Sequence, residues 1–248
     1  LTKVVKLLYR ISLAKASRIF FQNKIDHDLF LSNKLVEKDK IEVVPGSGVD
    51  CNRFKVRPFI AGRKQSQTVF LYAGRLLRDK GVNEYVEAAI QVKKLYPSAK
   101  FYLLGPTGVS NETAISMEQV EQWERSGSIE YLGETDDVKP YINNVDCVVL
   151  PSYREGMPRV LLEAAAMGRP LLASNSVGCV DIVKDQVNGL LCRIKDPNDL
   201  ALKMIEFIKM PTAKRKKMGL AGRALVETEY NENYVIERYL EAVRVAVS

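Results

Sequence analysis

Short apolar runs alternate with stretches of helical periodicity along most of the chain. Strands are predicted at residues 69–73, 100–104, 129–132, 147–150, 171–173 and 190–192, and helices at residues 82–95, 112–125, 136–143, 159–167 and 180–184, before a helical tail that opens at residue 199. This order predicts right-handed βαβ units around a parallel sheet. The unbroken CVVL run at residues 147–150 is typical of a strand buried on both faces. We therefore expect an α/β fold with helices on both faces of the sheet.

The first part of the chain follows a different pattern. A strand is predicted at residues 17–22, a helix at 26–36 and a strand at 41–44. A loop at residues 45–63 follows, and Gly46, Gly48, Pro58 and Gly62 interrupt it. We place a domain boundary at the end of this loop. Residues 1–63 then form one unit with its linker, residues 64–229 the main domain, and residues 230–248 a C-terminal helix.

The composition is ordinary for a globular protein, with 46% hydrophobic and 27% charged residues among 248. No apolar run reaches the roughly 18 residues of a membrane span, so no transmembrane helix is expected. The chain starts with Leu1 and shows no signal-peptide pattern, so we interpret it as an internal piece of a longer protein.

The cysteines and the single histidine limit the chemistry. The four cysteines are widely spaced, and His27 lies in a polar stretch, which disfavours a Cys/His zinc site and a His-dependent hydrolase. Cys147 and Cys192 lie in apolar runs and are expected to be free, buried thiols. Such thiols fit a reducing compartment, and we expect a cytoplasmic protein.

The net charge of +7 is concentrated in two basic blocks. The first holds Lys3, Lys6, Arg10, Lys15, Arg18 and Lys24, and the second holds Lys209, Lys214, Arg215, Lys216, Lys217 and Arg223. Apolar residues interleave with the first block, which favours peripheral association with the inner face of a membrane. The second block is interpreted as a solvated helix face. Neither block comes with a nucleic-acid recognition motif, so no nucleic acid is expected.

Ligands of an open parallel sheet bind beyond the carboxyl ends of its strands. The loop GRLLRDKG after the strand at residues 69–73 places Gly74, Arg75 and Lys80 just before a helix. Cations and free N–H groups at that position suit a diphosphate, although solvated cations would fit the same spacing. The phosphate-loop and G-x-G-x-x-G patterns are absent, which disfavours a P-loop ATPase and a dinucleotide dehydrogenase. Gly105 and Gly133 follow the next two strands, where a nucleoside or an ordinary turn would fit equally well, and Asp136 is a candidate helix cap.

The richest segment runs from residue 151 to residue 168. Pro158 suits the first turn of a helix and Gly168 its C-terminal end, so Glu155 lies in the preceding loop and Glu163 inside the helix. A carboxylate on this apolar helix is costly unless it is paired or bound to a ligand hydroxyl. Two carboxylates beside a helix N-terminus suit a phosphorylated sugar; the alternative is an ion pair between Glu163 and an arginine.

These segments together resemble family four of the retaining glycosyltransferases, which have the GT-B fold of two Rossmann-like domains. Glu155 and Glu163 match the family's Glu-x7-Glu motif, within PSYREGMPRVLLEAAAMGRPLLAS. GRLLRDKG, VPGSGVDCNRF and GCVDIVKDQVNGLLC match other family segments, and the resemblance covers the chain from about Ile19 onward. It implies a Rossmann-like donor domain with a truncated remnant of the acceptor-side domain.

The resemblance also assigns roles to the candidate residues. Arg75 and Lys80 would contact the donor diphosphate and stabilise the departing nucleotide, Glu155 would hold hydroxyls of the transferred sugar, and Glu163 would bind the ribose. The other residues expected around the donor are Gly74, Gly105, Gly133, Gly156, Met157, Pro158 and Arg159. No metal and no cofactor are expected.

The segment EGMPRVLLEAAAMGRP resembles enzymes that extend lipid-linked oligosaccharides for capsule or O-antigen, commonly from UDP-sugars such as UDP-N-acetylhexosamines. Asn175 and Asp181 depart from the family pattern and leave the donor sugar open, including a GDP-sugar. A non-catalytic binding module would be expected to lose Glu155, Arg75 or Lys80. A related epimerase would need histidine chemistry, and a phosphorylase a longer chain with a cofactor lysine.

Residues 1–58 resemble the final portion of the family's first domain, which binds the acceptor. We therefore expect this chain to bind a nucleotide but not to transfer a sugar. Exposed apolar surface on the truncated unit is expected to favour dimerisation.

Overall fold

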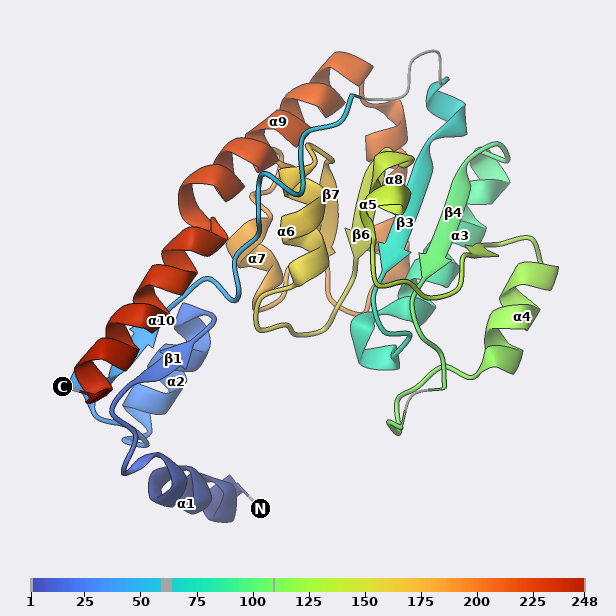
Figure 1. Ribbon diagram of the computed structural model, residues 1–248. Helices are drawn as coiled ribbons and strands as arrows, with labels where there is room; N and C mark the ends of the chain where they lie inside the picture. The colour runs from blue at the N-terminus through green and yellow to red at the C-terminus, as the bar shows by residue number, and fades with distance from the viewer. Residues whose placement is uncertain (1, 59–63, 109, 248) are drawn as a thin grey trace.

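The computed structural model describes residues 2–58, 64–108 and 110–247. Within them, a six-stranded parallel sheet has the order β5-β4-β3-β6-β7-β8 (Figure 1). Its strands are β3 (Val69–Ala73), β4 (Lys100–Leu104), β5 (Glu130–Tyr131), β6 (Cys147–Leu150), β7 (Leu171–Ser174) and β8 (Gly189–Cys192). The expected Rossmann-like α/β fold is confirmed.

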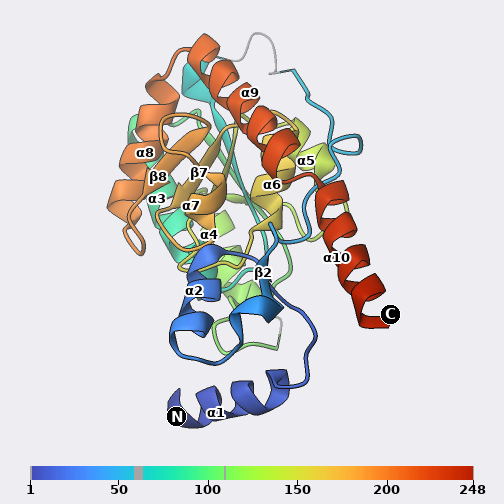
Figure 2. The same cartoon turned by 90° about the vertical axis from the view of Figure 1, so that its left-hand side faces the viewer.

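Helices cover both faces of this sheet (Figure 2). One face carries α3 (Val82–Leu95) and α8 (Pro197–Lys209), and the other carries α5 (Lys139–Asn143), α6 (Arg159–Ala166) and α9 (Thr212–Glu229). α4 (Met117–Arg125) lies beside β5, and α7 (Cys179–Ile182) follows β7. Short 3₁₀ turns lie at Lys38–Lys40, Gln65–Gln67 and Arg78–Lys80.

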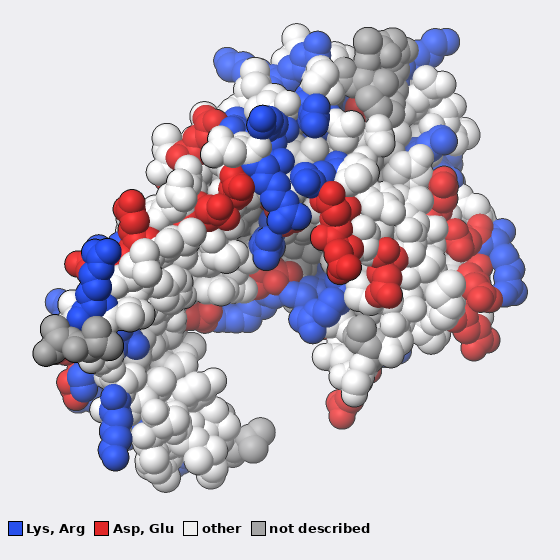
Figure 3. All heavy atoms as spheres, in the orientation of Figure 1, with Lys and Arg blue, Asp and Glu red and all other residues white. Residues whose placement is uncertain are grey.

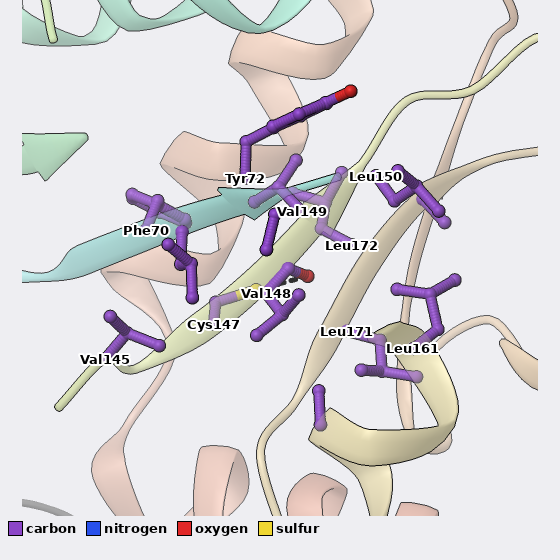
Figure 4. Close-up of a cluster of buried hydrophobic side chains, with 14 of the residues drawn as sticks. Phe70, Tyr72, Val145, Cys147, Val148, Val149, Leu150, Leu161, Leu171 and Leu172 are labelled. Carbon is purple, nitrogen blue, oxygen red and sulfur yellow. Dashed lines mark hydrogen bonds between the residues drawn. The ribbon is translucent and has the colours of Figure 1, made fainter. Parts of the chain in front are cut away.

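The core lies on the central strands. Every residue of β3, β6 and β7 is buried, as the apolar runs predict. Side chains of these strands and of α6 form one cluster, and the Tyr72 hydroxyl points away from it (Figure 4). Cys147 and Cys192 are buried free thiols, as predicted, and burial raises the pKa of both.

A smaller unit precedes the main sheet. It contains α1 (Thr2–Leu13), the parallel pair β1 (Ile19–Phe21) and β2 (Ile41–Val43), and α2 (Lys24–Ser32). α10 (Glu232–Val247) returns from the main domain to this unit (Figure 1). There the rings of Phe20 and Tyr239 lie 4.5 Å apart, and Arg238 forms an ion pair with Glu42. The predicted boundary at residue 63 lies at residues 59–63, outside the described residues, and the division into domains stays a prediction.

The face of α1 seen in Figure 3 is largely uncharged. Its exposed large side chains include Val4, Leu7, Leu8 and Ile11. Two of its cations bind the end of α2: Lys6 donates to the Asn33 side chain at 2.5 Å, and Arg10 donates to the carbonyls of Asn33 and Lys34 at 3.1 Å. Part of the first basic block therefore holds the C-terminal end of α2. None of the described helices is both long and apolar enough to cross a membrane.

The predicted ends of three helices are wrong. Side-chain hydrogen bonds fix the starts of α4 and α5, and a left-handed residue follows the end of α2. α4 begins at Met117 rather than residue 112, since the Ser116 hydroxyl accepts from the N–H of Gln119 at 3.2 Å. Asp136 is not a cap: α5 begins at Lys139, whose N–H donates to Asp137 at 3.2 Å. α2 ends at Ser32, before Lys34 turns to a φ of 53°.

The interpretation of the second basic block as a solvated face is wrong for two of its members. Arg215 is 4% exposed and donates to the carbonyls of Ile208 and Met210. Arg223 donates to carbonyls of the linker, at Cys51 and Phe54, and to Ala166. These guanidinium groups join distant segments instead of facing solvent.

Arg169 is fully buried, and its guanidinium donates to backbone carbonyls of two segments. These carbonyls are Arg57, Pro58, Ile142 and Asn143, at 2.9 to 3.1 Å. Arg169→Leu leaves them without this donor, so we expect the free energy of unfolding to fall by about 2–4 kcal/mol. Urea unfolding measures the change. The control Arg125→Leu, at an exposed position, should change the free energy of unfolding by no more than about 0.5 kcal/mol. An equal change in both variants would contradict a stabilising role for the Arg169 hydrogen bonds.

Candidate donor-binding site

The strand order of the main sheet reverses between β3 and β6, because β4 lies on one side of β3 and β6 on the other. Loops leaving the strands at such a point diverge and open a crevice at the carboxyl ends. A cavity of about 290 Å³ lies there. The predicted residues that line it are Gly74, Arg75, Lys80, Glu155, Pro158, Arg159 and Glu163.

The loops after β3 and β6 touch each other. Gly81 has a φ of 74°, and a Cβ on it would lie 2.1 Å from the carbonyl oxygen of Pro151. The N–H of Tyr153 donates to the carbonyl of Asp79 at 2.9 Å. A side chain at Gly81 would separate the loops, so glycine at this position lets both loops present side chains to one cavity.

Lys80 and Glu155 meet across these loops. The lysine Nζ lies 2.6 Å from the Glu155 Oε2, and the side chains are 17% and 12% exposed. Arg75, on the same cavity, is exposed and forms no ion pair in the part of the chain that the structure describes. Glu155 therefore neutralises Lys80, whereas Arg75 has no acidic partner among the described residues. A diphosphate could bind Arg75 directly and draw Lys80 away from Glu155.

Glu163 lies one turn inside α6. Its side chain is 10% exposed, and the Nε of Arg159 lies 3.2 Å from its Oε1. The ion pair expected as the alternative to a ligand is thus present, but its arginine is 66% exposed. Burial raises the pKa of Glu163, and the Arg159 guanidinium opposes part of that rise. The carboxylate is poorly compensated for its burial, and a ligand hydroxyl would be an additional donor.

The α6 N-terminus also faces this cavity through Pro158 and Arg159. Pro158 is the residue before the helix, one position earlier than the first turn predicted for it. The first N–H groups of a helix have no intrahelical acceptor, and the helix dipole favours negative charge beside them. The arrangement thus adds backbone donors to Arg75 and Lys80.

The sequence did not identify the apolar wall of the cavity, formed by Tyr72, Val138, Leu150 and Val160. The fully buried Tyr72 donates from its hydroxyl to the carbonyl of Arg75 at 3.0 Å, which holds the loop after β3. Burial raises the pKa of Tyr72, and the charges of Glu155 and Asp79 add to the rise. Tyr72 therefore stays neutral at physiological pH.

Gly105, Gly133, Gly156 and Met157 do not line this cavity. The N–H of Gly105 donates to the carbonyl of Gly133 at 2.8 Å, and a Cβ on Gly105 would lie 1.9 Å from the carbonyl oxygen of Gly74. Gly105 thus lets two loops pack closely. Gly156 contacts the N-terminal unit, where its carbonyl accepts from Asn23 Nδ2 at 3.3 Å, and Met157 lines a second cavity. Their roles toward a donor stay predictions.

In the described ranges, no cluster of three or more His, Cys, Asp and Glu side chains could hold a metal ion. The cavity instead presents ammonium, guanidinium and backbone N–H groups, which can neutralise an anion. Chemistry without a metal stays a prediction.

Comparison with known families matches residues 55–225 to the model "Glycosyl transferases group 1". The chain belongs to this family. The matched region includes both loops of the cavity and all of α6.

Two similar curated proteins are bacterial glycosyltransferases. The chain is 29% identical to the Campylobacter jejuni N,N'-diacetylbacillosaminyl-diphospho-undecaprenol alpha-1,3-N-acetylgalactosaminyltransferase, over 96% of this chain and 63% of the relative. It is 30% identical to the Escherichia coli UDP-Gal:alpha-D-GlcNAc-diphosphoundecaprenol alpha-1,3-galactosyltransferase, over 78% of this chain and 53% of that protein. The chain thus spans between half and two thirds of the length of these two relatives.

Solved structures confirm the GT-B fold. Anabaena HepE in complex with UDP has a TM-score of 0.81 at 19% identity, covering 97% of this chain and 68% of that one. Sucrose-phosphate synthase from Thermosynechococcus elongatus has a TM-score of 0.80 at 21% identity, covering 99% of this chain and 63% of that one. The described residues therefore adopt roughly two thirds of a glycosyltransferase of this fold.

Glu163 provides a test of the site's electrostatics. Its pKa in the folded state is raised above 4.5, so the folded chain keeps a proton that the unfolded chain has lost. The free energy of unfolding contributed by Glu163 therefore falls as pH rises from 4.5 through the raised pKa. Urea unfolding measures this effect. We expect the free energy of unfolding of wild type minus that of Glu163→Gln to decrease as pH rises through that window.

The exposed Glu118 lies on α4 and serves as the matched control for this measurement. The difference between wild type and Glu118→Gln should not decrease across the same pH window. A flat or rising difference for Glu163→Gln would contradict the buried, incompletely paired carboxylate.

Proposed function

We propose that the chain carries the donor-binding part of a retaining glycosyltransferase. The enzyme would transfer a sugar from a UDP-sugar to a lipid-linked or oligosaccharide acceptor in bacterial surface polysaccharide synthesis. The observation that carries this proposal is the cavity between β3 and β6, where Arg75 and Lys80 lie beside Glu155 and Glu163. Cations for a diphosphate and carboxylates for hydroxyls are thereby combined at one strand switch point.

In the proposed mechanism, the diphosphate displaces Glu155 from Lys80. Lys80, Arg75 and the first N–H groups of α6 then stabilise the negative charge that grows as the bond between the sugar and the diphosphate breaks. Glu155, released from its ion pair, accepts hydrogen bonds from hydroxyls of the transferred sugar. Glu163 accepts from the ribose. The acceptor hydroxyl oxygen forms the new bond to the anomeric carbon on the face that the diphosphate leaves, and its proton passes to the departing diphosphate. No protein nucleophile and no metal take part.

The proposed donor is a UDP-sugar, with an N-acetylhexosamine as one choice. Two relatives support this donor: one is an N-acetylgalactosaminyltransferase, and the name of the other includes UDP-Gal. The same names include diphospho-undecaprenol acceptors, which supports a lipid-linked acceptor here.

We also propose cytoplasmic, peripheral binding to the inner face of the membrane. The apolar side chains exposed on α1 support it, with Lys3 and Lys15 nearby in sequence. A second copy of the chain would cover the same surface in the alternative arrangement, a dimer.

Calorimetric titration with UDP, GDP and ADP tests the donor site. We expect UDP to bind, and Lys80→Met and Glu163→Ala each to weaken it about tenfold or more, the loss of a charge-assisted hydrogen bond. The exposed Lys94→Met is the matched control and should bind UDP like wild type. A preference for GDP would replace the proposed UDP-sugar, and UDP binding unaffected by either site variant would remove the assignment of the cavity.

A transfer assay tests whether this chain binds the nucleotide without transferring a sugar. With UDP-N-acetylgalactosamine and a lipid-diphosphate N-acetylglucosamine acceptor, we expect UDP binding by this chain but no sugar transfer, since most of the acceptor side would lie outside it. Mass spectrometry of the acceptor gives the readout. A product of increased mass would show that these 248 residues suffice.

A further inference from the structure

A cavity of about 240 Å³ lies between the linker and α5, and it shares no lining residue with the donor cavity. Its charged lining residues are Arg53, Lys55, Arg57, Lys139 and Asp137. Figure 3 shows Lys and Arg side chains gathered over the linker on this face of the main domain. We call this space the linker cavity. Its lining is strongly basic, with four cations and one acid.

Three of these cations come from an alternating segment of the linker, RFKVR at residues 53–57. The three cations line the cavity, whereas the two apolar residues between them do not. Phe54 is 4% exposed, and a Cβ on Gly168 would lie 3.2 Å from the Cγ1 of Val56. The apolar residues thus pack on the main domain, and the alternation leaves the three cations together on the side of the cavity.

Hydrogen bonds fix the backbone that carries the cations. The guanidinium of Arg169 donates to the carbonyl of Arg57 at 2.9 Å, and that of Arg223 donates to the carbonyl of Phe54 at 2.7 Å. The guanidinium carbon of Arg53 lies 5.4 Å from the centre of the Phe54 ring, a cation–π contact. The cations are therefore held near one another before any ligand arrives, which reduces the entropy cost of binding.

The positive charge of the linker cavity is largely uncompensated. Lys139 has an acidic neighbour, with its Nζ 3.5 Å from the Oδ2 of Asp137. The side chains of Arg53, Lys55 and Arg57 form no ion pair with any residue that the structure describes. Like charges gathered in this way repel one another, and an anion between them relieves the repulsion.

The chemistry of the lining indicates the class of anion. Guanidinium groups bind phosphate oxygens in pairs, and the lysine and the Asn143 amide supply further donors. A phosphoryl group carries roughly 1.5 to 2 negative charges near neutral pH, which suits three unpaired cations better than one carboxylate does. The cavity is smaller than the roughly 300–1,000 Å³ of sites for drug-sized ligands. A phosphoryl group with a small substituent therefore fits it.

The linker cavity is a neighbour of the donor cavity. Asp137 and Lys139 line the linker cavity, and Val138, between them, lines the donor cavity. Burial raises the pKa of Glu163, and the charge of Arg53 is among those that lower it. An anion in the linker cavity would thus lie beside the donor cavity and reduce the field of Arg53 at Glu163.

We propose that the linker cavity binds a phosphoryl group, held by the guanidinium groups of Arg53 and Arg57 and the ammonium group of Lys55. The site is separate from the place of the donor diphosphate and independent of the proposed donor function. A small phosphate ester in solution and the phosphate of a lipid headgroup offer these cations the same oxygens.

Phosphorus-31 NMR of inorganic phosphate tests the site on the full chain, at constant ionic strength and with saturating UDP. We expect wild type to broaden the phosphate signal. Arg57→Gln and Lys55→Gln should each weaken binding about threefold or more, and the double variant about tenfold, since each removes an exposed charge contact. The exposed Lys94→Gln on α3 changes the net charge equally and should bind phosphate like wild type.

Three outcomes would overturn the linker site: no phosphate binding by wild type, binding that UDP abolishes, or an equal loss in Lys94→Gln. Lys80→Met, measured without UDP, should keep the phosphate binding that depends on Arg57. If wild type binds no UDP while phosphate binding still depends on Arg57 and Lys55, the proposed donor function fails and the linker site stands.

Flotation with phosphatidylglycerol vesicles distinguishes the two sources of the phosphoryl group. Vesicle binding that is weaker in the Lys55 and Arg57 double variant than in Lys94→Gln would identify a lipid headgroup. Equal vesicle binding by both, together with phosphate binding that only the double variant loses, would identify a soluble phosphate ester. Equal behaviour of both variants in both experiments would overturn the site.

Discussion

The contact between the loops after β3 and β6 determines most of what this structure can do. The loops approach closely enough that a side chain at Gly81 would collide with the carbonyl of Pro151. At that separation Lys80 reaches Glu155, and α6 begins beside both. The reversal of strand order supplies the crevice, and the loop contact supplies its charges. Widening this contact would separate Lys80 from Glu155 without unfolding the sheet.

The strands and the charged loops after β3 and β6 could be predicted from the sequence, because unbroken apolar runs and charged loops bounded by glycines are local signals. Helix starts were less accessible. Asp136 and Asp137 are neighbouring residues of the same type, so the sequence does not distinguish them. The folded path of the chain determines that Asp137, and not Asp136, accepts from the first N–H of α5. The apolar wall of the donor cavity was also hidden, since Tyr72 and Leu150 follow the same pattern whether they face the core or a ligand.

Buried arginines set a second limit on prediction. Arg215 was interpreted as part of a solvated helix face and Arg169 was not singled out, because arginines are mostly exposed. Their environments depend on carbonyl groups far away in sequence, such as Arg57 and Asn143 for Arg169. Guanidinium groups with several donors suit such junctions, where chain segments end without a secondary-structure partner. No local sequence pattern predicts that these two arginines are buried, whereas the motif around Glu155 is continuous in the sequence.

The same arginine contacts have a mechanical consequence. Arg169 and Arg223 fasten the linker, at residues such as Pro58 and Phe54, to the main domain, so the linker moves with that domain. The chain passes between the two units twice, in the linker after β2 and at the junction of α9 and α10. A hydrogen bond joins these two passages, from the N–H of Val49 to the carbonyl of Tyr230 at 2.9 Å. Both chain passages thus share one pivot at Val49. Rotation of the N-terminal unit about that pivot would change its separation from the main domain and, through the hydrogen bond from Asn23 to the Gly156 carbonyl, would act on the loop that carries Glu155.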